Sequence, residues 1–290
     1  MSISLSCKLS LYADDSALLF SHRDSNIIAS RLSSELSRCK QWLVDNRLSL
    51  HVGKTECLLF GSKRKLKAIE NFPVHCDGTP VERKFSVKYL GVTLDANING
   101  SVHTGNIMKV CAGRLAFLYR YSSLLDTKCR QTLCSSLIQP HLDYCCSSWH
   151  GGLSVALKER LNVVQRKMVR FVYGMDFRGH VDNKNFRDLS WLKIPDRVKF
   201  FRLSHIFRIR HKLAPSYLLP NFKSISEAHT HNMRGSSYNF HISRELSLSP
   251  NSFSFSAIKH WNELPSSLKS IDDFRVFKRK LKQFLLDQYD

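Results

Sequence analysis

The stretch "LYADDSALLF", residues Leu11–Phe20, places two adjacent carboxylates, Asp14 and Asp15, between two short runs in which apolar and polar residues alternate. Such alternation is typical of β-strands, and Asp is a common residue in tight turns. The sequence therefore predicts a β-hairpin with Asp14 and Asp15 at its turn. Two ionised carboxylates about 5 Å apart repel each other by roughly 3 kcal/mol at an effective dielectric near 20. Such a pair binds a cation or has one raised pKa, unless it is simply a solvated turn.

The composition indicates a soluble, strongly basic protein. The chain has 290 residues, which is long enough for two domains. Its 44 Lys and Arg residues outnumber 24 Asp and Glu residues, so the formal net charge is +20. This excess favours nucleic acid over a membrane as the partner, and a basic protein without such a partner is the alternative. The sequence contains no recognisable targeting segment and no apolar run long enough to cross a membrane.

The cysteines do not form a disulfide framework. They number nine, are scattered along the chain and include no CxxC motif. This usage indicates a reducing, intracellular compartment, so we expect the protein in the nucleus, the cytoplasm or both. One group of potential metal ligands comprises Cys134, His141, Cys145 and His150. Its spacing fits no common zinc pattern, and we expect these residues to belong to a packed core.

The pattern of apolar residues predicts an α+β protein whose strands come first. A helix begins at about Asp24 or Ser25, either of which can cap it. An apolar stripe at helical spacing follows, at Ile28, Leu32, Leu36, Cys39 and Leu43. A basic loop is predicted at Ser62–Lys67. Further strands are predicted at Lys54–Gly61 and at Val87–Leu94, which ends at Asp95. The helical period then dominates, at Ile107–Leu125, Cys129–Leu137, Leu157–Tyr173, Pro195–His211 and in a basic amphipathic helix at the C-terminus.

The tetrapeptide Tyr12-Ala13-Asp14-Asp15, in its strand–turn–strand setting, resembles motif C of reverse transcriptases. The similarity is to the RNA-directed DNA polymerases of non-LTR retrotransposons, in the jockey-like group of LINE elements. The resemblance implies that Asp14 coordinates catalytic Mg²⁺, with Mn²⁺ as the alternative ion, and that Asp15 is the second, less constant carboxylate. It also implies that Tyr12 lies near the primer terminus and helps to hold the template and primer.

Two further segments match this family in the expected order. "NRLSLHVGKTECLLF" (Asn46–Phe60) is similar to motif D, which implies that Lys54 lies near the phosphates of the incoming nucleotide. The alternative is a surface lysine before a strand. "KYLGVTLD" (Lys88–Asp95) is similar to motif E, the hairpin that grips the primer. The resemblance implies that this hairpin contacts the primer through Tyr89, Leu90 and Gly91, and the alternative is a bulge in an ordinary strand.

The resemblance also divides the chain into three regions. It implies a partial polymerase palm of antiparallel strands with a packed helix at 1–96, and a helical thumb-like region at 97–150. A basic, mostly helical region covers 151–290 and contains a loop-rich stretch at 223–256. Basic helices in the last region are expected to contact the backbone of an RNA–DNA duplex through Arg166, Lys167 and Arg170, unless these residues form a solvated helix face. The aromatic and basic residues of Phe200–Arg210 favour a core stripe over a stacking surface.

The implied reaction is magnesium-dependent addition of deoxynucleoside triphosphates to a DNA primer on an RNA template. The family needs another catalytic Asp, in motif A, well upstream of motif C, and only eleven residues precede Tyr12 here. We therefore expect a C-terminal fragment that does not polymerise DNA by itself, so enzymatic activity stays open. The alternative is a non-catalytic, nucleic-acid-binding relic of a mobile element. The sequence predicts no oligomeric state.

Overall fold

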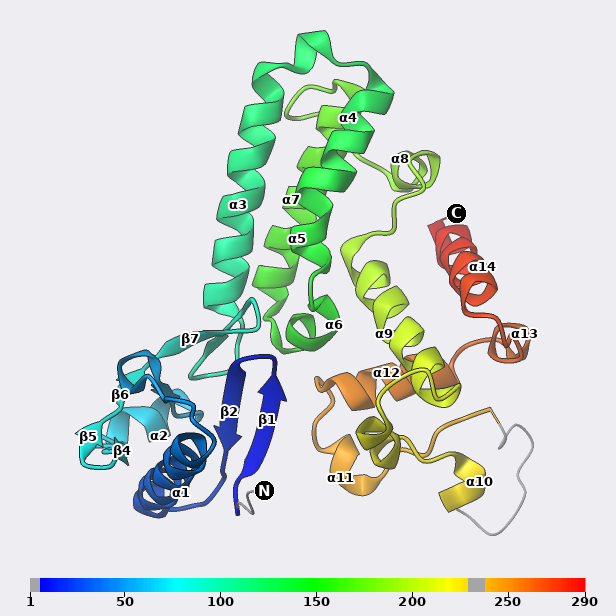
Figure 1. The fold of residues 1–290 in the computed structure, drawn as a ribbon. Helices are drawn as coiled ribbons and strands as arrows, with labels where there is room; N and C mark the ends of the chain where they lie inside the picture. The colour runs from blue at the N-terminus through cyan, green and yellow to red at the C-terminus, as the bar shows by residue number, and fades with distance from the viewer. Residues whose placement is uncertain (1–5, 229–237, 290) are drawn as a thin grey trace. The chain divides into compact units, whose positions relative to one another are not determined.

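The computed structural model describes residues 6–228 and 238–289. The chain separates into two compact units, Met1–His103 and Thr104–Asp290 (Figure 1). Every named strand of the described residues lies in the first unit, and the second unit is built from helices and the segments that join them. The predicted α+β class is therefore confirmed. Helix α3, Ser101–Arg120, begins in the first unit and continues into the second.

The first unit combines short strands with one long helix. Its elements are β1 Lys8–Tyr12, β2 Asp15–Leu19, α1 Ser25–Asp45, a 3-10 turn Val52–Lys54, β3 Glu56–Leu58, α2 Lys63–Ala68, β4 His75–Cys76, β5 Thr79–Pro80, β6 Glu82–Lys84, β7 Ser86–Tyr89 and β8 Val92–Asp95. In the described residues these strands form four two-stranded sheets. The pairs β1–β2, β4–β5 and β7–β8 are antiparallel, and β3–β6 is parallel.

Helix α1 forms because its first turn is capped and one of its faces is apolar. The carboxylate of Asp24 accepts a hydrogen bond of 2.8 Å from the backbone N–H of Asn26, so Asp24, one of the two predicted cap candidates, is the N-cap. The apolar face covers a small core that comprises Ala29, Cys57, Leu59, Phe72, Val74, Cys76 and Val81. Ile28, Leu32 and Leu36, from the predicted helical stripe, pack against this core.

The β4–β5 hairpin is attached to the same helix by polar contacts. Ser33 Oγ accepts a hydrogen bond of 2.9 Å from the backbone N–H of His75, and Ser37 Oγ accepts one of 3.2 Å from that of Asp77. Lys40 forms a 2.9 Å ion pair with Asp77. The turn of the hairpin consists of Asp77 and Gly78, both with positive φ (48° and 78°), as is usual for an Asp-Gly hairpin turn.

Three local predictions need correction. The basic segment Ser62–Lys67, expected to be a loop, forms helix α2, because Ser62 Oγ caps the N–H of Lys65 and Leu66 packs on the core. The single strand expected at Val87–Leu94 is the β7–β8 hairpin, since Leu90 and Gly91 adopt positive φ of 45° and 81° and reverse the chain. The strand expected at Lys54–Gly61 is shorter, at Glu56–Leu58.

The second unit combines long helices with several shorter ones. Its elements are the rest of α3, a 3-10 turn Ser122–Leu124, α4 Thr127–Leu133, a π-turn Cys134–Ile138, α5 Gln139–Asp143, α6 Cys146–Trp149, a 3-10 turn His150–Gly152, α7 Val155–Tyr173, α8 Asn183–Asp188, α9 Ile194–Arg210, a 3-10 turn Ser216–Asn221, α10 Ile225–Ala228, α11 Arg244–Ser247, α12 Phe253–Asn262, α13 Ser266–Lys269, α14 Phe274–Leu286 and a 3-10 turn Asp287–Tyr289. The predicted helices at 157–173 and 195–211 agree with α7 and α9 to within two residues at each end. The stretch predicted to be loop-rich, 223–256, holds α10, α11 and the first turn of α12, and its residues 229–237 lie outside the described residues.

Buried aromatic and aliphatic side chains hold this unit together. The ring of Phe207, from α9, stacks on that of Phe277, from α14, with 4.5 Å between centroids, and Trp261 of α12 lies 5.8 Å from Phe277. All three side chains are fully buried. The predicted core stripe within 200–210 is confirmed for Leu203, Ile206, Phe207 and Ile209. Phe200 and Phe201, in contrast, are only half-buried.

The cysteines of this unit are largely core residues. Cys134 and Cys146 are buried, and burial raises the pKa of each thiol to about 12. Cys145 is exposed. No group of three or more His, Cys, Asp or Glu side chains in residues 6–228 and 238–289 is arranged to hold a metal ion.

Candidate functional site

The β1–β2 hairpin carries the Tyr-Ala-Asp-Asp sequence at its tip. Its register runs from Lys8 opposite Leu19 to Tyr12 opposite Asp15, so the turn consists of Ala13 and Asp14. The turn thus lies one residue earlier than predicted, and Asp15 is the first residue of β2. A two-residue turn matches the twist of the flanking strands but needs positive φ. Ala13, which is not a glycine, adopts φ of 50° to provide it.

The register assigns the side chains of the hairpin to two faces, because directly opposed residues in an antiparallel pair point the same way. One face carries Ser10, Tyr12, Asp15 and Ala17, and the other carries Leu9, Leu11, Ser16 and Leu18. Asp14 and Asp15 are both exposed, and the side chains of Tyr12 and Leu11 are 67% and 65% exposed. The acidic tip is therefore open to an incoming ion or ligand.

A buried carboxylate attaches the start of β1 to helix α1. Glu35 accepts hydrogen bonds from the backbone N–H of Ser6, at 3.2 Å, and from Ser6 Oγ, at 2.5 Å. Its second oxygen forms a 3.1 Å ion pair with Arg38. The hydrogen bonds from Ser6 lower the pKa of Glu35, and the side chain is buried. These hydrogen bonds attach the chain to α1 at Ser6, two residues before the start of β1 at Lys8.

A second contact joins the acidic hairpin to the β7–β8 hairpin. The hydroxyl oxygens of Ser10 and Tyr89 lie 3.3 Å apart, within hydrogen-bonding distance. Because Ser10 shares its face with Tyr12 and Asp15, Tyr89 approaches the face that carries these two predicted site residues. Leu90 and Gly91 form the turn next to Tyr89. Ser10 was not predicted as a site residue, although the alternation along β1 already placed it on the same side as Tyr12.

The base of the β7–β8 hairpin is held by a buried structural carboxylate. Asp95 Oδ1 accepts hydrogen bonds from the backbone N–H groups of Asn97, at 3.2 Å, and Asn99, at 3.1 Å. His103 Nδ1 accepts one of 3.2 Å from the backbone N–H of Thr93. These contacts stabilise the turn after β8, so the role of Asp95 is structural.

The other predicted site residues lie apart from these contacts. Lys54 ends the 3-10 turn Val52–Lys54 with its side chain exposed, and no hydrogen bond or ion pair joins it to Asp14 or Asp15. On α7, Arg166 forms a 2.5 Å ion pair with Glu159, and Arg170 Nε donates a 2.8 Å hydrogen bond to the carbonyl of Gly179. Lys167 is exposed. The roles of these four residues stay predictions.

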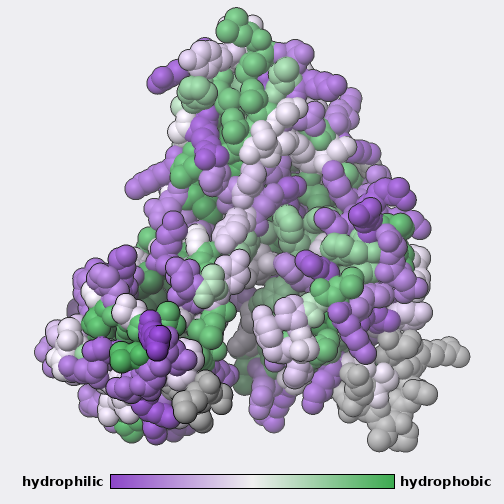
Figure 2. Space-filling view, in the orientation of Figure 1, coloured by the Kyte–Doolittle hydropathy of each residue, from purple (hydrophilic) through white to green (hydrophobic). Residues whose placement is uncertain are grey.

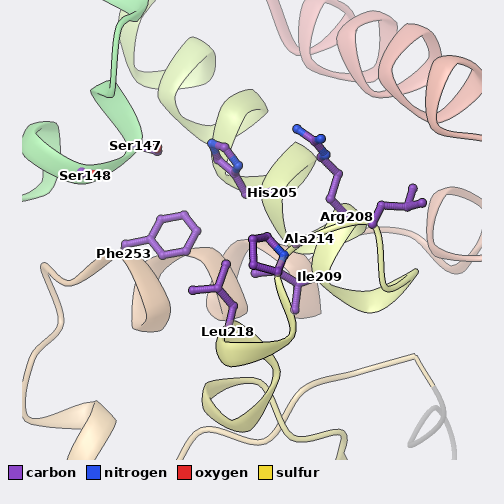
Figure 3. A pocket seen from close by; sticks show the side chains of 10 residues that line it. Ser147, Ser148, His205, Arg208, Ile209, Ala214, Leu218 and Phe253 are labelled. Carbon is purple, nitrogen blue, oxygen red and sulfur yellow. The ribbon is translucent and has the colours of Figure 1, made fainter. Parts of the chain in front are cut away.

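A pocket of about 290 Å³ lies elsewhere, in the second unit (Figure 3). Its wall is largely apolar, with Leu218, Ala214 and the ring of Phe253, and His205 and Arg208 supply its charged or titratable groups. The lining contains no carboxylate. A cation that needs oxygen ligands is therefore unsuited to this pocket, and the hairpin tip is the better candidate.

The tip offers the donor atoms that Mg²⁺ prefers, since both side chains are carboxylates. The two aspartates are adjacent in sequence, exposed and not engaged in an ion pair among the described residues. The two aspartates can supply only part of a magnesium ligand set. Among the described residues, no third acidic or histidine side chain joins them.

Comparison with known proteins finds the chain similar to RNA-directed DNA polymerases from mobile elements, in agreement with the resemblance seen in the sequence motifs. It is 24% identical over 194 residues to the protein named "Probable RNA-directed DNA polymerase from transposon X-element" of Drosophila melanogaster, which covers 66% of this chain. It is 25% identical to "RNA-directed DNA polymerase from mobile element jockey" of the same organism over an alignment of 211 residues, which covers 69% of the chain. A third relative, from transposon BS, is 25% identical over an alignment of 225 residues, which covers 73% of the chain.

The matched segments represent 21%, 22% and 24% of these three relatives, so the chain spans about a quarter of their length or less. No family model matches the chain, and no solved structure matches it. Within the described residues, every helix is too short or too polar to traverse a lipid bilayer.

Proposed function

We propose that the chain is the C-terminal part of a reverse transcriptase from a non-LTR retrotransposon. The observation that carries this proposal is the position of the Tyr-Ala-Asp-Asp sequence at a two-residue hairpin turn, on a hairpin that contacts Tyr89 of the Lys88–Asp95 segment. Both segments were matched to this enzyme family from sequence alone. The relatives, named as RNA-directed DNA polymerases, support the same family.

In this proposal Asp14 and Asp15 hold Mg²⁺, or Mn²⁺, through their carboxylate oxygens. Bound magnesium supplies positive charge that stabilises the phosphate oxygens during nucleotide transfer. Tyr12 and the Tyr89–Gly91 turn position the end of the DNA primer, and the ammonium group of Lys54 neutralises the departing pyrophosphate. The RNA template and the deoxynucleoside triphosphates complete the set of partners.

The isolated β1–β2 sheet supports the idea that part of the palm is missing. Both outer edges of this sheet are unpaired among the described residues, and Leu9 and Leu11 are 37% and 65% exposed on one face. A two-stranded hairpin with an open apolar face is marginal by itself, and further strands or a helix normally cover it. We infer that upstream strands bring the third catalytic carboxylate, so the chain alone does not polymerise DNA.

The remainder of the chain takes the roles that the resemblance implies. Residues 1–96 form the partial palm, 97–150 the thumb-like region and 151–290 a basic, mostly helical region. The exposed Lys167, with Arg166 and Arg170, is proposed to contact the backbone of the RNA–DNA duplex, although the latter two also make contacts within α7 and its following loop.

The second candidate is a nucleic-acid-binding relic without catalysis. It is favoured by the pair of carboxylates at the tip, which lacks a third acidic partner in the described part of the chain. The two candidates differ in one property, the activity that appears when the upstream half of the palm is supplied.

The experiment is primer extension by a fusion in which the upstream part of the jockey polymerase precedes this chain. The polymerase proposal predicts incorporation of deoxynucleotides on a primed RNA template with Mg²⁺. Asp14→Asn abolishes it, whereas Asp45→Asn, an exposed carboxylate at the end of α1, leaves it unchanged. A folded fusion that binds the primed template but incorporates nothing supports the relic instead.

A further inference from the structure

Helix α14 carries a stripe of positive charge next to its buried face. The stripe follows the i, i+3, i+4, i+7 spacing, which places side chains on one side of a helix, and comprises Arg275, Lys278, Arg279 and Lys282. The neighbouring face of the helix carries Phe277, Leu281 and Leu285, which are fully buried. Hydrophilic side chains predominate on the visible surface around this helix (Figures 1 and 2).

Aromatic rings of α9 and α14 hold two cations in place, Lys278 of the stripe and Arg208 of α9. Lys278 Nζ lies 5.5 Å from the ring centroid of Phe274 and 5.8 Å from that of Phe200. Arg208 of α9 contacts the same Phe274 ring, with its guanidinium carbon 5.7 Å from the centroid. Contacts of this kind fix long side chains that would otherwise be mobile. We call Arg208 and the four residues of the stripe the cationic ridge.

The cationic ridge has no internal counter-charge. In residues 6–228 and 238–289 none of its five side chains has a carboxylate within ion-pair distance. Arg197, near the start of α9, differs from the ridge residues because it has a carboxylate partner. Its guanidinium donates two hydrogen bonds to the carboxylate of Asp143. Burial and the nearby Arg197 lower the pKa of Lys282. A group of cations without ion-pair partners favours a polyanion as the partner.

The packing of α14 distinguishes a nucleic acid from a membrane surface. A helix that lies on a membrane inserts an apolar face between the lipids. The apolar face of α14 is already buried by α9 and α12, through contacts such as those of Phe277 with Phe207 and Trp261. The stripe extends about 10 Å along the helix axis, and a nucleic-acid strand carries one phosphate per about 3.4 Å of duplex axis. The stripe therefore spans about three phosphates.

We propose that the cationic ridge on α9 and α14 binds the phosphate backbone of a nucleic-acid strand without reading its sequence. It lies entirely in the second unit and uses none of the residues assigned to the hairpins or to α7. Binding at the ridge is therefore separable from catalysis and from the proposed polymerase function.

The test compares two variants of the full chain that have the same net charge. The first is Arg275→Gln/Lys278→Gln/Arg279→Gln, whose three side chains are exposed. The matched control is Lys109→Gln/Lys128→Gln/Lys184→Gln, which removes three exposed lysines scattered over α3, α4 and α8. Binding to a fluorescein-labelled 20-nucleotide oligo(U) is measured by anisotropy between 50 and 300 mM NaCl, with thermal unfolding as the check of folding.

The ridge variant is expected to bind at least tenfold more weakly at 100 mM NaCl than the control. The slope of log affinity against log salt should fall by about two, because each single-strand phosphate contact contributes about 0.7. Arg275→Lys/Arg279→Lys keeps the charges and should retain binding. Asp14→Asn should also bind normally, even if the polymerase proposal fails.

Two outcomes would overturn the proposal. Equal losses in the ridge variant and in the control would mean that net charge alone controls binding. Binding of the chain to vesicles of phosphatidylserine and phosphatidylcholine, with no binding to oligo(U), would assign the ridge to a membrane surface instead.

Discussion

The hydroxyl groups of Ser10 and Tyr89 lie 3.3 Å apart, although 79 positions separate them in the sequence. This contact brings together two hairpins whose sequences were matched separately to motifs C and E of one enzyme family. Tyr12 and Asp15 share the face of the first hairpin with Ser10, so the contact orders the side of the hairpin that bears the candidate site. The relationship between the hairpins can therefore be tested through stability.

Removing either hydroxyl group should remove the same interaction. We expect Ser10→Ala and Tyr89→Phe each to lower the free energy of unfolding by about 0.5–1 kcal/mol, with a double variant that is little worse than either single one. Urea unfolding measures the coupling. Tyr217→Phe, at a side chain that is 74% exposed, is the control and should have no effect. Strictly additive losses from Ser10 and Tyr89 would show that the two hydroxyl groups do not interact.

Gly91 should be needed for the turn of the β7–β8 hairpin. Its φ of 81° suits glycine, so Gly91→Ala should destabilise the first unit by about 1 kcal/mol. Gly113, within α3, is the matched control because no atom lies within 4 Å of an added Cβ there. Gly113→Ala should stabilise its helix by up to about 1 kcal/mol. Thermal unfolding measures both changes in stability. If both substitutions stabilised the chain, or both destabilised it, this account would be contradicted.

The open face of the β1–β2 sheet should make the chain prone to self-association. Leu11 is 65% exposed beside an unpaired strand edge, a combination that favours pairing with another chain. Leu11→Lys should reduce association in light scattering at a given concentration, and Leu213→Lys, at an exposed leucine of the second unit, should not. If the wild-type chain and both variants were all monomeric, the open face would not need covering strands.

The second unit should lose stability in mild acid because of two histidines, the buried His150 and the half-buried His260. Burial lowers the pKa of His150, which is buried, and of His260, which is half-buried, to about 4. The positive charge of the buried Arg202 contributes to both shifts. The other cations that lower these pKa values are Lys158 for His150, and Lys199 and Lys259 for His260. The unfolded chain binds more protons than the folded one between pH 6.5 and 4, so the free energy of unfolding falls as the pH drops through this range.

Each histidine should contribute about 1–2 kcal/mol of this loss between pH 7 and pH 5. Urea unfolding at the two pH values measures it. His150→Gln and His260→Gln should each flatten the pH dependence, whatever their effect at pH 7. His180→Gln, at an exposed position, should leave the pH dependence as it is. A wild-type stability that is constant between these pH values would contradict the lowered pKa of both imidazoles in the folded chain.

Local patterns predicted much of the fold. The β1–β2 hairpin, the Asp24 cap of α1 and the helices α7 and α9 follow from alternation, capping chemistry and helical spacing. The segment Ser62–Lys67 was mistaken for a loop, because its charged residues concealed a cap at Ser62 and a single apolar anchor at Leu66. Propensity in a six-residue segment is too weak to decide between the two.

The contacts that position the candidate site could not be predicted from the sequence. The burial of Glu35 around Ser6, and the approach of Ser10 to Tyr89, depend on how distant segments pack. Sequence reasoning placed the turn at Asp14 and Asp15, whereas the observed register uses Ala13 in a conformation that favours glycine. Such a choice is decided by pairing along the whole hairpin and is invisible in the turn residues alone.

The most direct test asks whether the acidic turn binds a divalent ion next to nucleic acid. The measurement is paramagnetic broadening of backbone amide signals when Mn²⁺ is added to the ¹⁵N-labelled chain in complex with a primed RNA template. Selective broadening at Ala13, Asp14, Asp15 and Ser16, abolished by Asp14→Asn with the complex intact, is the predicted result. Sharp signals at these four residues, while signals elsewhere broaden, would contradict a metal-binding role for this turn.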